Sequence, residues 1–440
     1  MAEAVPAFAP FEVMIERLGA RGDGIARHGD AILHVPGALP GETVRVFRDE
    51  GSRALCDGDD AIRVASPERI APFCPVHGRC GGCVAQHMAP DLYARWKRGL
   101  LEHALSRAGL ETEVAPLVPA AGAGRRRLTF HAMRDDNGVL RVGFMAARSH
   151  DLVAIDHCPA AEPGLAGAPQ IARLLAEGYL AEQSAAACDI HVTSSVNGLD
   201  IDLRGGRSGA SGPSAGLRRR LITLADECDL ARLSVAGETL VMRRPPLQPM
   251  GQAAVLPPAG GFLQASATGE AVLAAHVRDA LRARPAPGTT KKKRKPVRRI
   301  AELFAGCGAF TLRLAEEVAV HAVEADAGAL VALDRAARET PGLKPVSHER
   351  RDLFRRPLLM PELCAFDAVV LDPPRAGCEA QTRQLARAQL PLVVYVSCDP
   401  VTLARDAALL VAAGYHLETV IPIDQFALTA HLECVAVLRK

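Results

Sequence analysis

Short apolar runs that end in polar residues and prolines recur in the last third of the sequence, and they restrict its fold more than any other feature. "FDAVVLDPP" (366–374) and "LVVYVSCDP" (392–400) are almost continuously apolar before they reach Asp-Pro. Strands buried on both faces have this pattern, and such strands belong to parallel sheets covered by helices. Because helical segments alternate with such runs from about residue 300, we predict a Rossmann-like α/β domain.

The end of the chain departs from this alternation. "YHLETVIPIDQF" and "HLECVAVLRK" follow each other with no long helix between them. We therefore predict that a final antiparallel pair completes the parallel sheet.

The chain has 440 residues, more than one hydrophobic core usually serves. Alternating apolar positions punctuated by Gly, Asp and Pro predict a small OB-like β-barrel over 1–65. Mixed strand and helix patterns predict an α+β domain over 66–260, and the Rossmann-like domain takes 261–440. The basic run Lys291–Lys295 lies in a stretch without acidic residues, which indicates a solvated linker, although contact with backbone phosphate is an alternative.

Composition restricts the environment of the protein. The formal net charge is +2, so a nucleic-acid site must come from local clustering of charge. We find no apolar run long enough to span a membrane and no signal peptide, so we expect a cytoplasmic protein with no membrane partner. We also expect a monomer. The chain has twelve cysteines, and in a reducing compartment clustered cysteines are expected to bind metal or to react rather than to form disulfides.

Reactive and polar side chains lie near the ends of the predicted strands. Glu302 and Phe304 belong to the first strand of the last domain, and Glu324 ends the second. Asp372 ends the fourth strand and Cys398 the fifth. Since ligands bind beyond the carboxyl ends of parallel strands, all five residues should face one crevice.

Two further features belong to the same edge. Gly306 and Gly308 form a glycine-rich turn that lets the backbone approach a ligand, although an ordinary tight turn would look the same. Glu324 lies where an acidic residue binds a ribose diol in nucleoside-binding sheets. Glu433 opens the last strand, and if that strand is antiparallel, its beginning lies beside Cys398.

A thiol and a carboxylate in such a crevice fit one reaction in particular. Asp-Pro-Pro after the fourth strand is typical of methyltransferases that act on nucleic-acid bases. C5 of a pyrimidine attacks a methyl donor only after a thiolate adds at C6, and a base must then remove the C5 proton. Cys398 fits the nucleophile, Glu433 the base and Asp372 the contact to the pyrimidine edge.

Six motifs occur in order over 261–440: "GFLQAS", "ELFAGCG", "VEAD", "LDPPRAG", "VYVSCDP" and "HLECV". In these motifs the chain resembles the S-adenosylmethionine-dependent RNA uracil-C5 methyltransferase family. The resemblance implies RNA as partner, S-adenosylmethionine as cofactor, Cys398 as nucleophile and Glu433 as base. The residues assigned to cofactor binding are Gln264, Phe304, Gly306, Gly308, Glu324, Asp352 and Asp372.

The sequence departs from the family pattern at two positions. Ala309 stands where Asn is frequent, so a side-chain contact is expected to be absent. Asp399 stands where Asn is common, and its carboxylate should raise the pKa of the neighbouring thiol unless it caps the next helix instead. Cys307 and Cys378 also flank the crevice, but neither has the Ser-Cys-x-Pro setting, and we interpret both as packing residues.

Four cysteines form a candidate metal site: Cys74, Cys80, Cys83 and Cys158. Four thiolates hold either zinc or an iron–sulfur cluster, and a tight trio with a remote fourth favours the cluster. His77 and His87 keep zinc as an alternative. The resemblance extends to this site, because family members that modify ribosomal RNA carry the same trio and remote His-Cys-Pro and bind a [4Fe-4S] cluster.

The beginning of the chain resembles a TRAM domain, an RNA-binding β-barrel, in "IERLGARGDGIAR" and "HVPGALPGETV". The adjacent Arg125, Arg126 and Arg127 are plausible phosphate contacts, although a solvated strand edge is the usual meaning of such a run. Barrel and cluster favour 23S ribosomal RNA over the transfer-RNA T-loop as substrate. Two other functions remain open: methylation of an amino group of a nucleic acid, which would not need Cys398 or Glu433, and non-catalytic RNA binding with a metal module.

Overall fold

The computed structural model describes residues 9–48, 53–56, 60–135, 137–181, 187–205, 213–283 and 296–440. The run Lys291–Lys295 lies outside them. The chain forms two compact units: unit 1 contains Met1–Leu100, Met145–Asp151 and Leu428–His431, and unit 2 contains Leu101–Phe144, Leu152–Ala427 and Leu432–Lys440.

Unit 1 contains an antiparallel sheet of short strands. They are β1 (Phe11–Leu18), β2 (Gly24–His28), β3 (Ala31–Val35), β4 (Thr43–Arg48), β5 (Ala54–Cys56) and β6 (Ile62–Val64). They pair in the order β3-β2-β1-β4-β5, with β6 also on β4, and a bridge between His34 and Arg53 brings β3 to β5. Val13 and Ile15 of β1 are buried and alternate with exposed residues, because one face of the sheet packs inward. The sheet is barrel-like, in keeping with the expected barrel.

Helix α1 (Pro90–Arg107) follows the cysteine-rich loop. Gly109 has a φ of +72°, and glycine adopts this left-handed conformation readily at the end of a helix. Within unit 1, Trp96 Nε1 donates a hydrogen bond to the carbonyl of Gly19 at 2.9 Å. The N–H of Val84 donates to the carbonyl of Leu428 at 2.7 Å, which fixes a segment from near the C-terminus in this unit.

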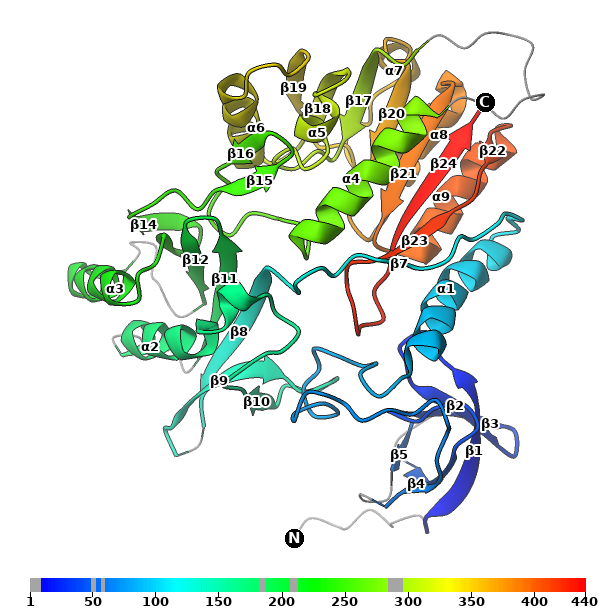
Figure 1. The fold of residues 1–440 in the computed structure, drawn as a ribbon, viewed down its shortest axis with the longest axis vertical. Helices are drawn as coiled ribbons and strands as arrows, with labels where there is room; N and C mark the ends of the chain where they lie inside the picture. The colour runs from blue at the N-terminus through cyan, green and yellow to red at the C-terminus, as the bar shows by residue number, and fades with distance from the viewer. Residues whose placement is uncertain are drawn as a thin grey trace. The chain divides into compact units, whose positions relative to one another are not determined.

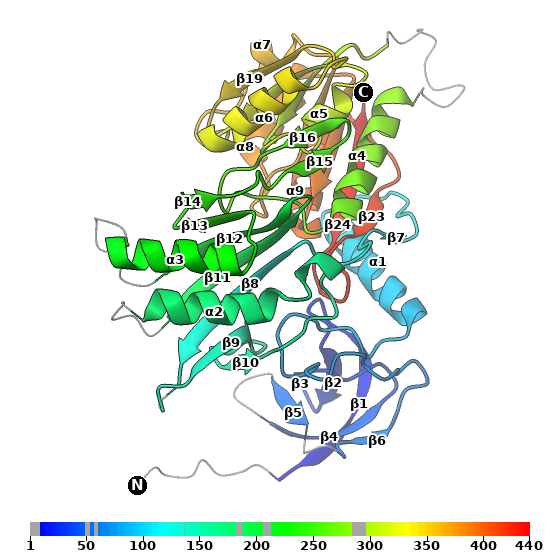
Figure 2. The ribbon, with the colours of Figure 1, turned by 60° about the vertical axis from the view of Figure 1, so that its left-hand side comes forward.

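Unit 2 begins with a mixed sheet against which two helices lie side by side (Figure 2). The strands are β8 (Arg127–Arg134), β9 (Leu140–Met145), β10 (Leu152–Ala154), β11 (Ala187–Ser195), β12 (Gly198–Arg204), β13 (Arg232–Val235) and β14 (Glu238–Met242), in the order β10-β9-β8-β11-β12-β13-β14. The helical elements are η1 (Pro163–Leu165), α2 (Ala168–Leu180) and α3 (Ala215–Glu227). A hairpin of β15 (Gln248–Met250) and β16 (Ala253–Val255) follows them.

The sheet predicted from the apolar runs forms the rest of unit 2 (Figure 1). Its strands are β17 (Arg299–Leu303), β18 (Ala319–Glu324), β19 (Val346–Arg350), β20 (Ala368–Leu371), β21 (Leu392–Ser397), β22 (His416–Leu417), β23 (Ile421–Asp424) and β24 (Glu433–Arg439). The order is β19-β18-β17-β20-β21-β24-β23, and β22 pairs with β24. Strands β17 to β21 are parallel, whereas β24 is antiparallel to β21 and β23. The Rossmann-like architecture and its final antiparallel pair are confirmed.

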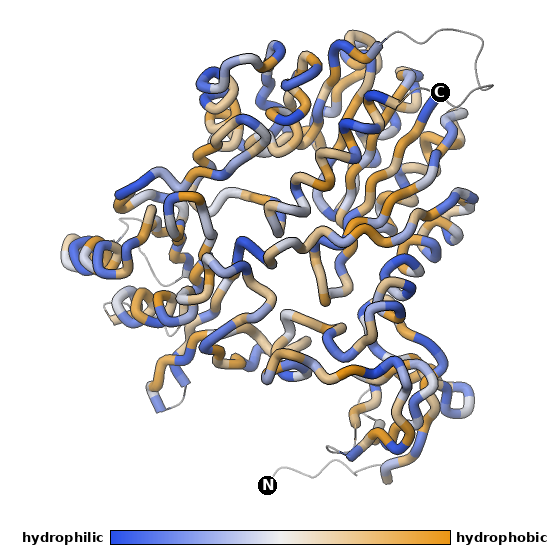
Figure 3. Tube along the Cα trace, in the orientation of Figure 1, coloured by the Kyte–Doolittle hydropathy of each residue, from blue (hydrophilic) through white to orange (hydrophobic). Residues whose placement is uncertain are grey.

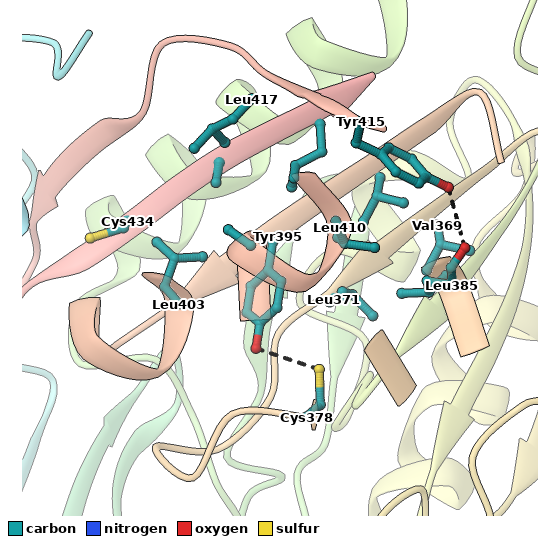
Figure 4. Packing of buried hydrophobic residues seen from close by; sticks show 14 of the residues in the cluster. Val369, Leu371, Cys378, Leu385, Tyr395, Leu403, Leu410, Tyr415, Leu417 and Cys434 are labelled. Carbon is teal, nitrogen blue, oxygen red and sulfur yellow. Dashed lines mark hydrogen bonds between the residues drawn. The ribbon is translucent and has the colours of Figure 1, made fainter. Parts of the chain in front are cut away.

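Helices cover both faces of this sheet. They are α4 (Ala267–Arg282), α5 (Thr311–Leu314), α6 (Ala327–Glu339), α7 (Met360–Leu363), α8 (Glu379–Ala388) and α9 (Pro400–Ala412). Leu273 and Val277 of α4 pack with Val394 of β21 on one face, and Leu403 of α9 packs with Tyr395 on the other (Figure 4). Successive strand residues serve opposite faces, so these strands are apolar along most of their length (Figure 3).

The sequence did not predict the strand that completes the outer edge of this sheet. Strand β7 (Val118–Pro119) pairs in parallel with β23, opposite Ile423 and Asp424. This strand comes from the segment expected to form the central domain. The three-domain division stays a prediction, since compactness groups the central and C-terminal segments in one unit. No helix of the described residues is both long and apolar enough to cross a lipid bilayer.

Candidate active site

Cys398 and Glu433 come from neighbouring strands of unit 2. Strand β21 ends at Ser397, and β24 begins at Glu433 and runs in the opposite direction. Ser397 pairs with Cys434 across the two strands. The residue after Ser397 and the residue before Cys434 therefore lie at the same edge of the sheet, as predicted from the antiparallel pairing.

A row of hydrogen bonds links the polar side chains at this edge. Asp372, which follows β20, accepts a hydrogen bond from Gln264 Nε2 at 3.0 Å. Gln425 Nε2 donates to Gln264 Oε1 at 2.7 Å and to Glu433 Oε1 at 2.9 Å. Gln264, Gln425 and Glu433 are buried, so solvent does not compete for these bonds. The row joins two of the predicted cofactor contacts to the predicted base through Gln425, which the sequence did not single out.

The surroundings of Cys398 favour a neutral thiol. Burial, together with the charges of Glu433 and Asp372, raises the pKa of this thiol to about 11, although Arg375 acts in the opposite direction. The reactive form of a cysteine is the thiolate. Cys398 is therefore mostly protonated near neutral pH in this arrangement of charges.

Asp399 caps helix α9, which was one of the two alternatives that the sequence left open for its carboxylate. Its Oδ1 accepts hydrogen bonds from the backbone N–H groups of Val401 and Thr402 at 2.9 and 3.2 Å. A carboxylate at this N-cap satisfies the first amides of α9 and faces the positive end of the helix dipole. Asp399 raises the pKa of Cys398 less than burial, Glu433 and Asp372 do. Capping explains why an acidic residue is tolerated beside the thiol.

Two further carboxyl groups contribute to the electrostatics of the site. Burial raises the pKa of Glu302 to about 8, although the hydroxyl of Thr311 donates a hydrogen bond to it at 2.5 Å. Burial also raises the pKa of Asp372, and the neighbouring charges of Glu433 and Glu302 add to this effect. Near neutral pH, Glu302 is therefore mostly protonated, and negative charge does not accumulate on every carboxyl group of the site.

The turn after β17 has the geometry of a ligand-binding turn. Phe304 adopts a φ of +64°, a left-handed conformation that is uncommon for a non-glycine residue and that occurs often at functional sites. A Cβ on Gly306 would meet nothing within 4 Å, so the turn is open on that side. A Cβ on Gly308 would lie 2.4 Å from Leu333 Cδ1, so packing explains the second glycine. Its assignment to cofactor binding stays a prediction.

Glu324 fixes this turn and keeps the capacity to bind a ligand. Its Oε2 accepts a hydrogen bond from Gly306 N–H at 2.9 Å, and its Oε1 accepts from Ala325 N–H and Asp326 N–H at 2.7 and 2.9 Å. A carboxylate offers about four acceptor sites, so these bonds do not exhaust it. The arrangement fits a carboxylate that also receives ribose hydroxyls.

Phe354 is a candidate that the sequence did not reveal. Its ring lies 5.5 Å from that of Phe304, centroid to centroid, and the side chain is half-exposed. Asp352 Oδ1 accepts a hydrogen bond from Phe354 N–H at 3.0 Å. Asp352 thus shapes the turn that presents the ring, and the two aromatic side chains are suited to contact a planar heterocycle.

The interpretation of Arg126 as a phosphate contact is wrong. Its side chain is buried and forms an ion pair with Glu270 at 2.5 Å. Its Nε donates to the carbonyl of Gln264 at 2.9 Å, and Arg127 donates to the carbonyl of Gly261 at 2.8 Å. These arginines hold the backbone of the "GFLQAS" segment, and a buried guanidinium needs such partners.

The other cysteines that flank the crevice are buried, in keeping with their interpretation as packing residues. Burial raises the pKa of both Cys307 and Cys378 to about 12. The Sγ of Cys378 lies 3.4 Å from the hydroxyl of Tyr395, below the core of apolar side chains (Figure 4). Cys398, whose pKa is lower and which is only half-buried, remains the candidate nucleophile.

The four candidate metal ligands are divided between the units. Cys74, Cys80 and Cys83 lie on one loop of unit 1, and Cys158 belongs to unit 2. Within the loop, Gly82 N–H donates to Cys80 Sγ at 3.4 Å. Across the described part of the chain, no three His, Cys, Asp or Glu side chains are grouped to hold a metal ion. The ligand set stays a prediction.

Sequence comparison places the chain among RNA-modifying enzymes. The model of the tRNA (uracil-5-)-methyltransferase family matches residues 290–440. An uncharacterised RNA methyltransferase of Brucella suis is 45% identical, with 98% of both chains covered. The 23S rRNA (uracil(1939)-C(5))-methyltransferase of Chromohalobacter salexigens is 36% identical, with 97% of this chain and 88% of that protein covered.

A solved structure shares the fold. The tRNA (uracil-54, C5)-methyltransferase of Pyrococcus abyssi, in complex with S-adenosyl-L-homocysteine, matches with a TM-score of 0.69 and 21% sequence identity. The match covers 97% of this chain and all of that chain.

Proposed function

The chain belongs to the RNA uracil-C5 methyltransferase family, and on this basis we propose that it methylates C5 of a specific uridine in 23S ribosomal RNA. The main structural support for this reaction is the antiparallel pairing of β21 with β24, because it brings Cys398 and Glu433 to the same edge of the sheet. Relatives named for 23S rRNA, 36% and 34% identical over 97% of this chain, support ribosomal RNA as the substrate. Methylation of an amino group is disfavoured, because it would need neither Cys398 nor Glu433.

Each residue of the site has its own role in the proposed reaction. The Cys398 thiolate adds to C6 of uracil, and the electron pair of the C5–C6 double bond moves toward C4–O4. S-adenosylmethionine supplies the methyl group that C5 accepts. Glu433 then takes the C5 proton, the C5–C6 double bond forms again, and the C6–S bond breaks. Asp372 and Gln264 would hold the pyrimidine edge and the methyl donor, and the hydrogen bond between their side chains supports a shared site.

The turn after β17 fits the nucleoside part of that donor. The open side of Gly306 gives space, Glu324 has acceptor sites for the ribose diol, and the rings of Phe304 and Phe354 suit an adenine. Asp352 supports this pocket through the backbone of Phe354.

Methylation of defined RNA tests the substrate. Purified protein with labelled S-adenosylmethionine is expected to label 23S rRNA transcripts at C5 of one uridine and to leave tRNA transcripts unlabelled. RNA containing 5-fluorouridine at that position should trap a covalent complex. The base can remove a proton from C5 but not a fluorine, so the C6–S bond cannot break. Labelling of tRNA alone would assign the protein to the T-loop instead, and labelling without a trapped complex would contradict the thiol mechanism.

We also propose that Cys74, Cys80, Cys83 and Cys158 hold a [4Fe-4S] cluster. The spacing of the trio supports this, as does the N–H group that Gly82 directs at Cys80 Sγ, since such bonds stabilise thiolate ligands. The cluster has no step in methyl transfer, and with the N-terminal barrel it would serve RNA docking.

Protein isolated without air is expected to contain about four iron and four sulfide ions per chain, as a cubane cluster requires. Cys80→Ser should lose the iron, whereas Cys56→Ser, which changes an exposed cysteine outside the trio, should keep it. Metal analysis by mass spectrometry measures both. One zinc ion without sulfide would identify a zinc site and overturn the proposal.

A further inference from the structure

Gln425 occupies the centre of the hydrogen-bond row at the active-site edge. It lies directly after β23, on the segment that returns toward β24. Its amide group uses both N–H bonds inside the site, one toward Gln264 at 2.7 Å and one toward Glu433 at 2.9 Å. Its side chain is 1% exposed, so water cannot replace these bonds.

The orientation of this amide follows from the chemistry of its neighbour. An ionised carboxylate only accepts hydrogen bonds, so the nitrogen of Gln425 must face Glu433 when Glu433 is ready to act as a base. The Oε1 atom of Gln425 is buried and finds no hydrogen-bond partner among the described residues. A buried acceptor without a partner is destabilising. In this orientation the Gln425 nitrogen donates two hydrogen bonds inside the site, while the Gln425 oxygen has no partner among the described residues. A residue whose role is functional can retain such a costly orientation.

Gly269 of the neighbouring helix α4 leaves the space that the Gln425 side chain occupies. Gly269 lies in the first turn of α4, and a Cβ there would lie 2.5 Å from Gln425 Cβ and 2.7 Å from its Oε1. Real Cβ atoms essentially never show such distances, so an alanine at this position must displace Gln425, and also the Ser266 hydroxyl, which would lie 2.8 Å from the new Cβ. Glycine is a poor helix former, and its presence here is explained by the space that Gln425 occupies.

We propose that Gln425 is a positioning residue that holds the Glu433 carboxylate toward the C5 proton and couples it to Gln264. The inference rests on the proposed uracil-C5 methylation and assigns a further residue to it. Gln425 exchanges no proton and forms no covalent bond. It supplies a neutral donor to a carboxylate that lies near Asp372, so it favours the ionised form of the base without adding charge.

The test separates proton removal from the steps before it. Gln425→Met keeps the length of the side chain and removes both donors. The methylated RNA adduct on Cys398 should form at a rate close to that of the wild type. Its breakdown should be about tenfold slower at neutral pH, which is the order of effect expected when a charged group loses one hydrogen bond. The pH midpoint of breakdown should move up by about one unit, because the ionised base has lost a hydrogen bond.

Gln381→Met is the matched control. Gln381 is also fully buried and forms two hydrogen bonds, with Leu358 N–H at 2.8 Å and the Leu358 carbonyl at 3.1 Å, but it lies on α8 outside the row. This variant should lose stability and keep the wild-type midpoint. Gly269→Ala, which keeps the amide but displaces it, should slow breakdown as Gln425→Met does, and it serves as the test if the latter does not fold.

The outcomes are distinct. A wild-type midpoint and breakdown rate in Gln425→Met, or in Gly269→Ala if that is the variant that folds, would overturn the role of Gln425. If the wild-type enzyme itself forms no adduct on Cys398 and places no methyl group on C5, the proposed function has failed instead.

Discussion

Cys398→Ala is expected to abolish methyl transfer and to leave binding of S-adenosylmethionine unchanged. Without the thiol, C6 receives no nucleophile and C5 does not become reactive toward a methyl donor. Loss of a covalent nucleophile lowers turnover by about 10⁴-fold or more. The proposed nucleoside contacts, Phe304 after β17 and Glu324 at the end of β18, belong to other elements than Cys398. The dissociation constant measured by calorimetry should therefore stay within about twofold of the wild-type value, since distant sites behave independently.

Cys307→Ala and Cys378→Ala are the controls for this change. Both thiols are buried, and each variant should retain turnover at reduced stability. Activity that persists in Cys398→Ala and disappears in one of the others would mean that another thiol is the nucleophile.

The pH dependence of alkylation gives an independent measurement on the same thiol. Because the pKa of Cys398 in the ligand-free protein is raised to about 11, modification by iodoacetamide at this residue should be slow at pH 7. Its rate should rise with pH until the thiol is ionised, in proportion to the thiolate fraction. Peptide mapping separates Cys398 from the exposed Cys56 and Cys364.

Glu433→Gln is expected to stop the reaction after methyl transfer. Thiolate addition and methyl transfer do not remove the C5 proton, whereas release of the product does. Glutamine keeps the size of the side chain but cannot act as a base, so turnover should fall by about 10²–10⁴-fold. A methylated RNA–protein adduct joined through Cys398 should accumulate, and denaturing electrophoresis with labelled methyl donor detects it.

Glu418→Gln controls for the loss of a carboxylate on the same sheet. Glu418 pairs with Arg439, the last residue of β24, at 2.7 Å, whereas Glu433 is the first residue of that strand. The variant should turn over normally and accumulate no adduct. An inactive Glu433→Gln protein without label, or one that turns over at the wild-type rate, would show that Glu433 is not the base.

The strands and their ends could be predicted because they depend on local pattern. A parallel strand covered on both faces must be apolar over its length, so "VVYVS" and "AVVL" locate β21 and β20 without further information. Once β24 was expected to be antiparallel, Cys398 and Glu433 had to share an edge. Their roles came from the resemblance to a family, which the comparisons confirm.

Partners that come together from distant segments could not be predicted. Gln425 has no local signal, because its function depends on Gln264 and Glu433 from other elements. Three adjacent arginines look the same in a sequence whether they face solvent or, like Arg126, pair with a buried glutamate. Phe354 lies 50 residues after Phe304, and only the folded turns bring the rings together.

The edge strand β7 has a consequence for how the protein is made. Thr112 Oγ1 donates a hydrogen bond to the carbonyl of Glu418 at 2.9 Å across 306 positions of the chain, and Val118 pairs with Ile423 nearby. The ribosome releases the segment with Thr112 and β7 long before the segment with Glu418 and β23. The edge of the sheet at which β7 pairs with β23 therefore cannot form during most of synthesis. Its last edge forms only when the C-terminal residues emerge. A nascent chain therefore cannot assemble this edge of the sheet before β23 and β24 have been synthesised.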